Sequence, residues 1–113
     1  GTVYVGSLGG SFYALDARTG AAKWSFAANA PIRSAPVLVG GTVVVAPRDG
    51  KVYGINRSNG EQRWEYAVGA QVLASVGVSG ETAYVSAMDE TVYAMNAIKG
   101  NKLWNASLKE EKK

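Results

Sequence analysis

The chain has 113 residues, with twelve Lys and Arg against nine Asp and Glu, giving a net charge of +3. This length suits a single domain, and 47% apolar with 19% charged residues indicate a folded core rather than a disordered segment. Zero Cys and zero His exclude disulfides and thiol catalysis, and remove the commonest general base and transition-metal ligand.

The basic residues are scattered and do not form the clustered face that phosphate binding requires, so we expect no nucleic-acid partner. No apolar run approaches the roughly 20 residues of a membrane span, and no leader pattern follows Gly1. The chain is therefore expected to be cytoplasmic, processed, or cut from something longer. Fourteen glycines with many Val, Thr and Tyr favour an all-β fold of short strands and tight turns.

A repeat of forty residues divides the chain into three units, because Trp24, Trp64 and Trp104 are evenly spaced. We place the units at residues 1–30, 31–70 and 71–108, followed by a charged tail at 109–113. The first unit begins with the equivalent of a second strand, at 2–6, and lacks a first strand. The second unit predicts strands at 34–39, 42–46, 51–56 and 62–68, and the third repeats that pattern, which gives eleven strands.

The connections between the strands are short, which predicts an antiparallel meander in each unit. Gly40-Gly41 is a two-residue hairpin signal. A five-residue turn joins the third and fourth strands of each unit. Its first residue accepts backbone N–H groups and its last residue, a glycine, takes the left-handed conformation of a bulged hairpin. The first residues are Asp16, Asn56 and Asn96, and the glycines are Gly20, Gly60 and Gly100.

Four antiparallel strands repeated every forty residues predict β-propeller blades. Three blades do not close a ring, so we interpret the chain as a fragment of about three four-stranded blades, the first lacking its first strand. The remaining blades are expected in a longer parent chain, in preference to a homo-oligomer.

The run at residues 13–24, ending in Trp24, resembles the tryptophan-docking motif of the PQQ-like repeat propellers, and Trp64 and Trp104 close the matching runs. The resemblance implies that each Trp lies in the outer strand and wedges its indole between adjacent blades. We therefore expect equivalent, largely buried positions for the three tryptophans, with Trp104 the most exposed if no blade follows it.

The same family includes quinoprotein dehydrogenases. For such an enzyme the resemblance implies a cofactor site with a vicinal Cys pair, a stacking Trp, a catalytic Asp and a calcium ion. That set has no place here, because Cys is absent, the tryptophans belong to docking motifs and Asp16 belongs to a turn. Asp89-Glu90 offers two local carboxylates where calcium takes six to eight oxygens, so a solvated turn is the favoured interpretation. We predict no catalytic, cofactor-binding or metal-binding residue.

Partner binding is predicted at one propeller face, where the loops from second to third strand and from fourth to first strand meet. Large apolar residues beside arginine concentrate binding energy at protein interfaces. The candidate partner-binding residues are Arg33, Ile32, Gln71, Leu73, Arg48 and Asp49. The alternative is that Ile32, Val72 and Leu73 start the inner strands and line the packed centre.

The predicted function is a non-catalytic protein–protein interaction scaffold, a segment of a longer extracytoplasmic propeller in the periplasm or at the cell surface. It resembles propeller lipoproteins of outer-membrane protein assembly. The alternative is a propeller segment of a PQQ-dependent quinoprotein dehydrogenase.

Overall fold

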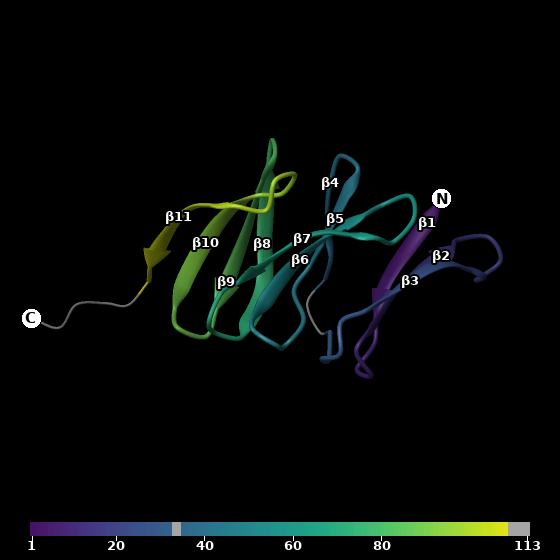
Figure 1. Cartoon of the computed structure of the whole chain (residues 1–113), viewed down its shortest axis with the longest axis horizontal. Coiled ribbons are helices and arrows are strands. Elements are labelled where there is room, and N and C mark those ends of the chain that lie inside the picture. The colour runs from purple at the N-terminus through teal and green to yellow at the C-terminus, as the bar shows by residue number, and fades with distance from the viewer. Residues whose placement is uncertain (33–34, 109–113) are drawn as a thin grey trace, which may run out of the picture.

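Three antiparallel β-sheets follow one another along the chain and stand in a row along the longest axis of the molecule (Figure 1). The computed structural model describes residues 1–32 and 35–108, with the backbone alone for 74–76. The molecule measures 57 × 28 × 21 Å, which reflects this arrangement of the sheets. Among the described residues no helix is present.

Each sheet is a meander in which strands adjacent in sequence pair with one another. The first sheet contains β1 (Thr2–Gly6), β2 (Ser11–Asp16) and β3 (Ala22–Ala27). The second contains β4 (Val37–Val39), β5 (Thr42–Val45), β6 (Lys51–Asn56) and β7 (Gln62–Ala67). The third contains β8 (Val72–Ser79), β9 (Thr82–Ala87), β10 (Thr91–Asn96) and β11 (Lys102–Ser107). The predicted all-β architecture of three blades, the first with three strands, is confirmed.

The turns contain glycines in the left-handed conformation, as predicted. Gly40 takes a φ of 56° in the hairpin that pairs Val39 with Thr42. The β2–β3, β6–β7 and β10–β11 turns each contain a left-handed glycine, and the strand register shifts beside each turn. These shifts are the β-bulges expected from a five-residue connection ending in glycine.

The first strand of the second blade is shorter than predicted. It begins at Val37 rather than at residue 34, which lies outside the described residues. Pro36 explains the difference for the described part, because proline has no N–H to donate to a strand ladder. In the third blade the corresponding residue is Val76, and β8 there extends over eight residues.

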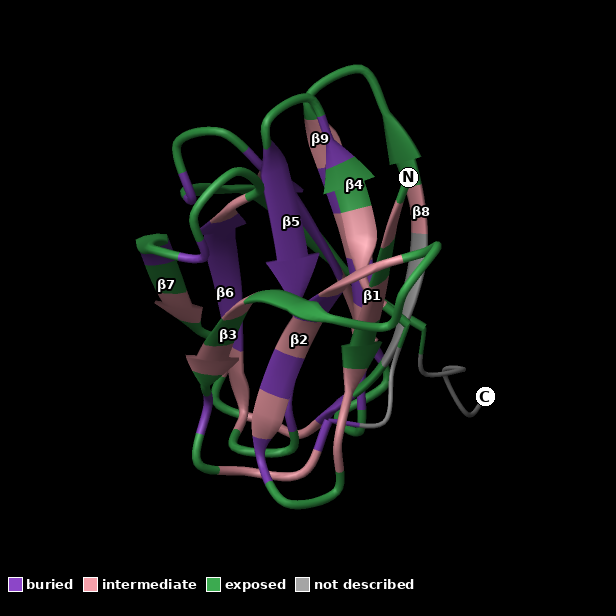
Figure 2. Ribbon diagram, turned by 90° about the vertical axis from the view of Figure 1, so that its right-hand side faces the viewer, coloured by how far each residue is buried: buried purple, intermediate pink, exposed green. Residues whose placement is uncertain are grey.

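The core lies between the sheets. One cluster, including Phe12, Val43 and Ile55, joins the first and second blades. A second, including Val44, Val85 and Met95, joins the second and third blades. The middle blade is therefore buried on both faces, and Figure 2 shows β5 and β6 almost entirely in the buried colour. β11 is exposed along its length.

Candidate functional site

The tryptophans of the first two blades each join one blade to the next. The indole Nε1 of Trp24 donates a hydrogen bond of 2.9 Å to the carbonyl oxygen of Arg57. Trp64 Nε1 donates one of 2.8 Å to the carbonyl oxygen of Ala97. In both cases the acceptor lies 33 residues later, in the five-residue turn of the following blade.

Glycine in that turn makes room for the indole. A Cβ atom built on Gly60 would lie 2.6 Å from a ring carbon of Trp24, and one on Gly100 would lie 2.5 Å from the Trp64 ring. Any side chain there would displace the tryptophan, so these glycines are required for close approach as well as for their positive φ. The predicted docking role of Trp24, Trp64, Gly60 and Gly100 thus has a direct geometric basis.

The first residue of each turn acts as predicted. Asp16 Oδ1 accepts the Arg18 and Thr19 amides at 2.8 and 3.3 Å. These bonds favour the ionised carboxylate and hold the pKa of Asp16 below its ordinary value. Asn56 and Asn96 accept equivalent amide bonds of 2.8 to 2.9 Å. These three side chains stabilise the turns.

The three tryptophans differ in burial. Trp64 is 9% exposed, Trp24 is half-buried against Tyr4 and Phe12, and Trp104 is 47% exposed. Trp104 packs on Tyr84 of its own blade, with 5.9 Å between ring centroids. No acceptor for its Nε1 is found within residues 1–32 and 35–108. Trp104 is thus the exposed member of the series, as expected.

The predicted partner-binding residues separate into different environments. Ile32 is 4% exposed and packs in the cluster between the first two blades, so it leaves the accessible set. It does not start the inner strand, as the alternative held, because β4 begins at Val37. A Cβ on Gly6, the last residue of β1, would overlap the Ile32 side chain, so glycine at this position makes room for Ile32. Leu73 is 56% exposed. Arg33 lies outside the described residues.

Arg48 and Gln71 lie together at the loop end of the blades. With the amide oriented so that its oxygen faces the guanidinium, Gln71 Oε1 accepts a hydrogen bond of 2.7 Å from Arg48 Nη2. The Arg48 amide also donates to the Pro31 carbonyl at 2.9 Å, and the Met88 amide donates to the Gln71 carbonyl at 2.8 Å. These bonds bring the loops from second to third strand beside those from fourth to first strand, as predicted.

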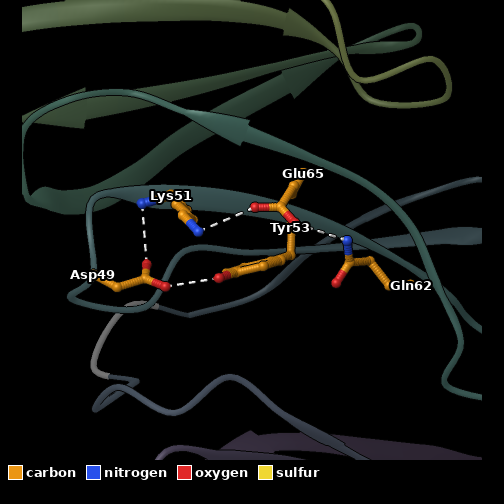
Figure 3. A network of polar contacts seen from close by, with 5 residues as sticks. All are labelled: Asp49, Lys51, Tyr53, Gln62 and Glu65. Atoms are coloured by element: carbon orange, nitrogen blue, oxygen red, sulfur yellow. Dashed lines mark hydrogen bonds and ion pairs between the residues drawn. The ribbon is translucent and has the colours of Figure 1, made fainter.

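Asp49 has an internal structural role (Figure 3). Its Oδ2 accepts a hydrogen bond of 2.7 Å from the Tyr53 hydroxyl, and its Oδ1 accepts the Lys51 amide at 3.0 Å. Lys51 pairs with Glu65 at 3.3 Å on the same side of the sheet. Burial first, and the bond to Asp49 second, raise the pKa of Tyr53 above its ordinary value.

The same arrangement recurs in the third blade. Asp89 accepts hydrogen bonds from the Thr91 amide at 3.1 Å and the Tyr93 hydroxyl at 2.9 Å. Asp89-Glu90 is therefore a turn, as favoured above, and no three acidic side chains converge on a metal position anywhere in the described part of the chain. The sequence signal for these Asp–Tyr hydrogen bonds is an aspartate four residues before the repeated tyrosine, at Asp49 and Asp89.

Exposed apolar side chains gather at the loop end of the third blade. A groove of about 520 Å³ is lined by Leu73, Ser86, Ala87, Met88, Glu90 and Leu108. Leu73, Met88 and Leu108 are 56%, 59% and 61% exposed. A hollow of about 200 Å³ continues from Leu73 to Arg48 and Gln71. We call Arg48, Gln71, Leu73, Met88 and Leu108 the loop-end surface. The β5–β6, β7–β8 and β9–β10 loops lie along the lower edge of the molecule in Figure 1.

Met88 and Leu108 were missing from the predicted set. Met88 lies in the β9–β10 loop, on the face where partner binding is predicted, but nothing in its residue type separates an exposed methionine from a core one. Leu108 is the third copy of Ala28 and Val68, which pack at the two blade junctions, so the repeat alone indicates a junction position there and not a partner-binding one. Among the described residues, no helix is long and apolar enough to cross a membrane.

Comparison with known proteins identifies related sequences and folds. The family described as outer membrane protein assembly factor BamB matches residues 1–67 and 37–113. No curated protein matches the sequence of the chain significantly. BamB from Moraxella catarrhalis superimposes with a TM-score of 0.84 at 24% identity, over 94% of this chain and 33% of that one.

Two further solved structures share the fold. A europium-containing methanol dehydrogenase gives a TM-score of 0.77 at 21% identity, over 93% of this chain and 23% of that one. BBS1N, solved in complex with ARL6DN, gives 0.76 at 24% identity, over 95% of this chain and 33% of that one. The chain thus spans between about a quarter and a third of the length of these structures, and the likeness at such identities concerns the fold.

Proposed function

Because the chain belongs to the family of the outer membrane protein assembly factor BamB, we propose that it is a non-catalytic scaffold that binds a protein partner at its loop-end surface. The observation that carries the proposal is the groove at the third blade, where Leu73, Met88 and Leu108 are each more than half exposed. Exposed apolar side chains that line one hollow gain free energy when a partner covers them.

The surface has the composition of a protein-binding site. Its apolar part lies beside Arg48, whose guanidinium is held by Gln71 and is therefore already oriented when a partner arrives. Arginine and large apolar groups dominate binding energy at protein interfaces, and fixing their conformation before binding reduces the entropy lost on association. An apolar segment with a neighbouring carboxylate is the complementary partner chemistry.

Membership of this family also supports a proposal for the cellular location of the protein and for the class of its partner. BamB is named as an assembly factor of outer membrane proteins, so we propose an extracytoplasmic location, in the periplasm or at the cell surface. The partner is then another component of outer-membrane protein assembly. The complex of BBS1N with ARL6DN provides an example of this fold bound to a second protein.

Crosslinking from defined positions tests the proposal. A photoreactive phenylalanine analogue replaces Leu73 or Met88 in the parent protein expressed in its own cells, and a third variant carries the analogue at Leu38. Leu38 is 45% exposed but lies in β4, away from the loops of this surface. We expect positions 73 and 88 to capture the same protein and position 38 to capture none of it. Equal capture at all three positions, or none at 73 and 88, would contradict the proposal.

The alternative, a segment of a quinoprotein dehydrogenase, rests on the likeness to the methanol dehydrogenase, which concerns the fold. The residues do not fit the cofactor. The chain has no Cys, and the Trp24 and Trp64 indoles are held at blade junctions by their hydrogen bonds. Adding the quinone and calcium should therefore produce neither a shifted quinone absorbance nor dye-linked alcohol oxidation, and either signal would restore the alternative.

A further inference from the structure

Basic residues that are far apart in sequence lie at one end of the strands. We call it the turn end, because it holds the β2–β3, β6–β7 and β10–β11 turns and the β4–β5 and β8–β9 hairpins, opposite the loop-end surface. The two hairpins stand at the upper edge of the molecule in Figure 1. Each blade contributes one basic residue from its five-residue turn and one from the first two residues of its outer strand. The six are Arg18, Lys23, Arg57, Arg63, Lys99 and Lys102.

All six side chains are exposed, and their charges are not neutralised by carboxylates. Lys23 Nζ donates a hydrogen bond of 2.7 Å to Thr2 Oγ1, and Arg63 Nη1 donates one of 3.0 Å to Thr42 Oγ1. These hydroxyl acceptors are neutral, so they position the cations without cancelling the charge. Among the described residues the only ion pair lies toward the other end of the second blade and involves none of the six.

The balance of charge therefore differs between the two ends of the strands. At the turn end the six basic residues stand against Asp16, Glu61 and Glu81. Toward the loop end, the described charged residues are Arg48 and Lys51 against Asp49, Glu65, Asp89 and Glu90. The excess positive charge of the described chain is concentrated at the turn end, so an anionic surface would attract that end in preference to the other.

The repeat itself does not require these charges. The basic residue of the turn is the third turn residue in the first blade, at Arg18, the second in the next, at Arg57, and the fourth in the last, at Lys99. Docking of one blade on the next uses a turn glycine and a backbone carbonyl, for which no charged side chain is needed. A cation thus recurs in every turn although the fold fixes neither its position nor its charge, which indicates a role at the surface.

An exposed apolar side chain lies among the cations of the third blade. Ile98 is 37% exposed in the β10–β11 turn, immediately before Lys99. Asn96 Oδ1 accepts the amides of both residues at 2.9 Å, so the tip of this turn has a defined shape. Proteins that lie on a membrane surface combine apolar side chains of this kind with basic groups that attract anionic lipids.

We propose that the turn end attaches the protein to the surface of a bilayer that contains anionic phospholipid. This inference rests on the location proposed above, in which an outer membrane is near. The six cations are distributed over all three blades of a molecule 57 Å long and do not surround a pocket, so they suit a plane of headgroups better than one small ligand. The loop-end surface then points away from the bilayer and stays open to its partner.

Vesicle flotation of the purified parent protein tests the proposal. The protein should bind vesicles of phosphatidylglycerol and phosphatidylcholine, but not vesicles of phosphatidylcholine alone, and added salt should release it, because salt screens exposed charges. The double variant Arg18→Gln/Lys99→Gln should bind the anionic vesicles about tenfold or more weakly, since each basic residue near such a surface contributes about a factor of five.

A matched control lowers the net charge equally at the other end. Asn29 is exposed in the β3–β4 loop, and Lys51 is partly exposed at the start of β6. The double variant Asn29→Asp/Lys51→Gln makes the same change of two charges as the turn-end variant, and it should bind vesicles as the wild type does. Equal losses in the two double variants would overturn the proposal, because net charge alone would then explain binding. Circular dichroism checks that both variants retain their sheet content.

Crosslinking from positions 73 and 88 separates this inference from the proposed function. The turn-end double variant should still capture the partner, because its loop-end surface is unchanged. A wild-type protein that captures the partner but does not bind anionic vesicles overturns the inference and leaves the scaffold proposal standing. Vesicle binding that ignores headgroup charge also overturns the inference, as does binding of duplex DNA that is as tight as binding of the anionic vesicles.

Discussion

Gly60 and Gly100 share their backbone conformation with Gly20, but a tryptophan ring lies against the first two only. This difference separates two reasons for keeping glycine at the end of the turn. A positive φ strains any residue with a Cβ, whereas contact with the indole excludes a side chain on steric grounds. The three positions together form an internal comparison, because one has the first constraint alone and two have both.

The first prediction is that Gly100→Ala is more destabilising than Gly20→Ala. The strain at φ near 80° should cost about 1–2 kcal/mol in both variants. The methyl group pressed against Trp64 should add about 1–3 kcal/mol in Gly100→Ala, as overpacking does elsewhere. Urea unfolding at neutral pH measures the free energy of unfolding of both variants. Equal losses would show that the indole moves aside freely.

The second prediction concerns alkaline pH. The raised pKa keeps folded Tyr53 neutral where an unfolded tyrosine, with a pKa near about 10, ionises. Unfolding then releases a proton, so stability is fully present below about pH 10 and falls as the pH rises above it. In Tyr53→Phe the free energy of unfolding should decrease less steeply with pH. Unfolding midpoints measured below and above about pH 10 in wild type and variant test this. A slope unchanged from wild type would assign the alkaline loss to other groups.

At the scale of elements, the β9–β10 turn carries a strain that its copies avoid. Glu90 has a φ of 61°, and the equivalent residues in the first two blades are Gly10 and Gly50, with φ values of 93° and 81°. The turn keeps its shape despite the glutamate, because the Glu90 carbonyl still accepts a hydrogen bond of 2.6 Å from the Leu108 amide. Gly10 and Gly50 accept the same bond at 2.8 Å from Ala28 and Val68.

The third prediction is that Glu90→Gly stabilises the chain by about 1 kcal/mol, because glycine adopts a left-handed conformation without the Cβ clash. Glu90→Ala is the control, since it removes the same carboxylate and retains the strained Cβ. Thermal unfolding should rank Glu90→Gly above wild type and Glu90→Ala close to wild type. A gain in both variants would trace the effect to the lost charge.

The sequence predicted elements well where turn chemistry determines them, and less well elsewhere. The 51–56 strand and the three Asx–glycine turns agree with the structure, because hydrogen bonding by Asp16, Asn56 and Asn96 is local. The 34–39 strand was placed too early, because a proline inside an apolar run was not treated as a boundary. Burial of Ile32 depends on the absent side chain at Gly6, a contact between blades that no local pattern contains.

At the scale of the whole molecule, stability depends on how many neighbours a blade has. The middle blade has a packed face on each side, and its Trp64 is 9% exposed. The outer blades each have one packed face, and β11 is exposed throughout. The row is therefore quasi-one-dimensional, with stability that approximates a sum of blade terms and junction terms.

The fourth prediction follows from this difference between the middle and outer blades. Trp64→Ala should cost about 3–5 kcal/mol, since it removes a large buried side chain and leaves a cavity between two blades. Trp104→Ala should lower the free energy of unfolding by about 1 kcal/mol or less, because nearly half of the Trp104 surface is already exposed to water. Denaturant unfolding compares the two variants directly. Similar losses would mean that Trp104 supports its own blade as strongly as Trp64 supports the junction.

The constant separation of 33 residues between each docked indole and its acceptor has an evolutionary consequence. A recombination event that removed residues 41–80 would join Gly40 directly to Glu81. Gly100 would then follow Trp24 at the same separation in sequence as Gly60 does now. The indole would still find a left-handed glycine and a turn carbonyl. A gene for such a chain can therefore lose or gain a whole blade in one step, because the new blade junction uses the same indole, glycine and carbonyl contacts as the old one.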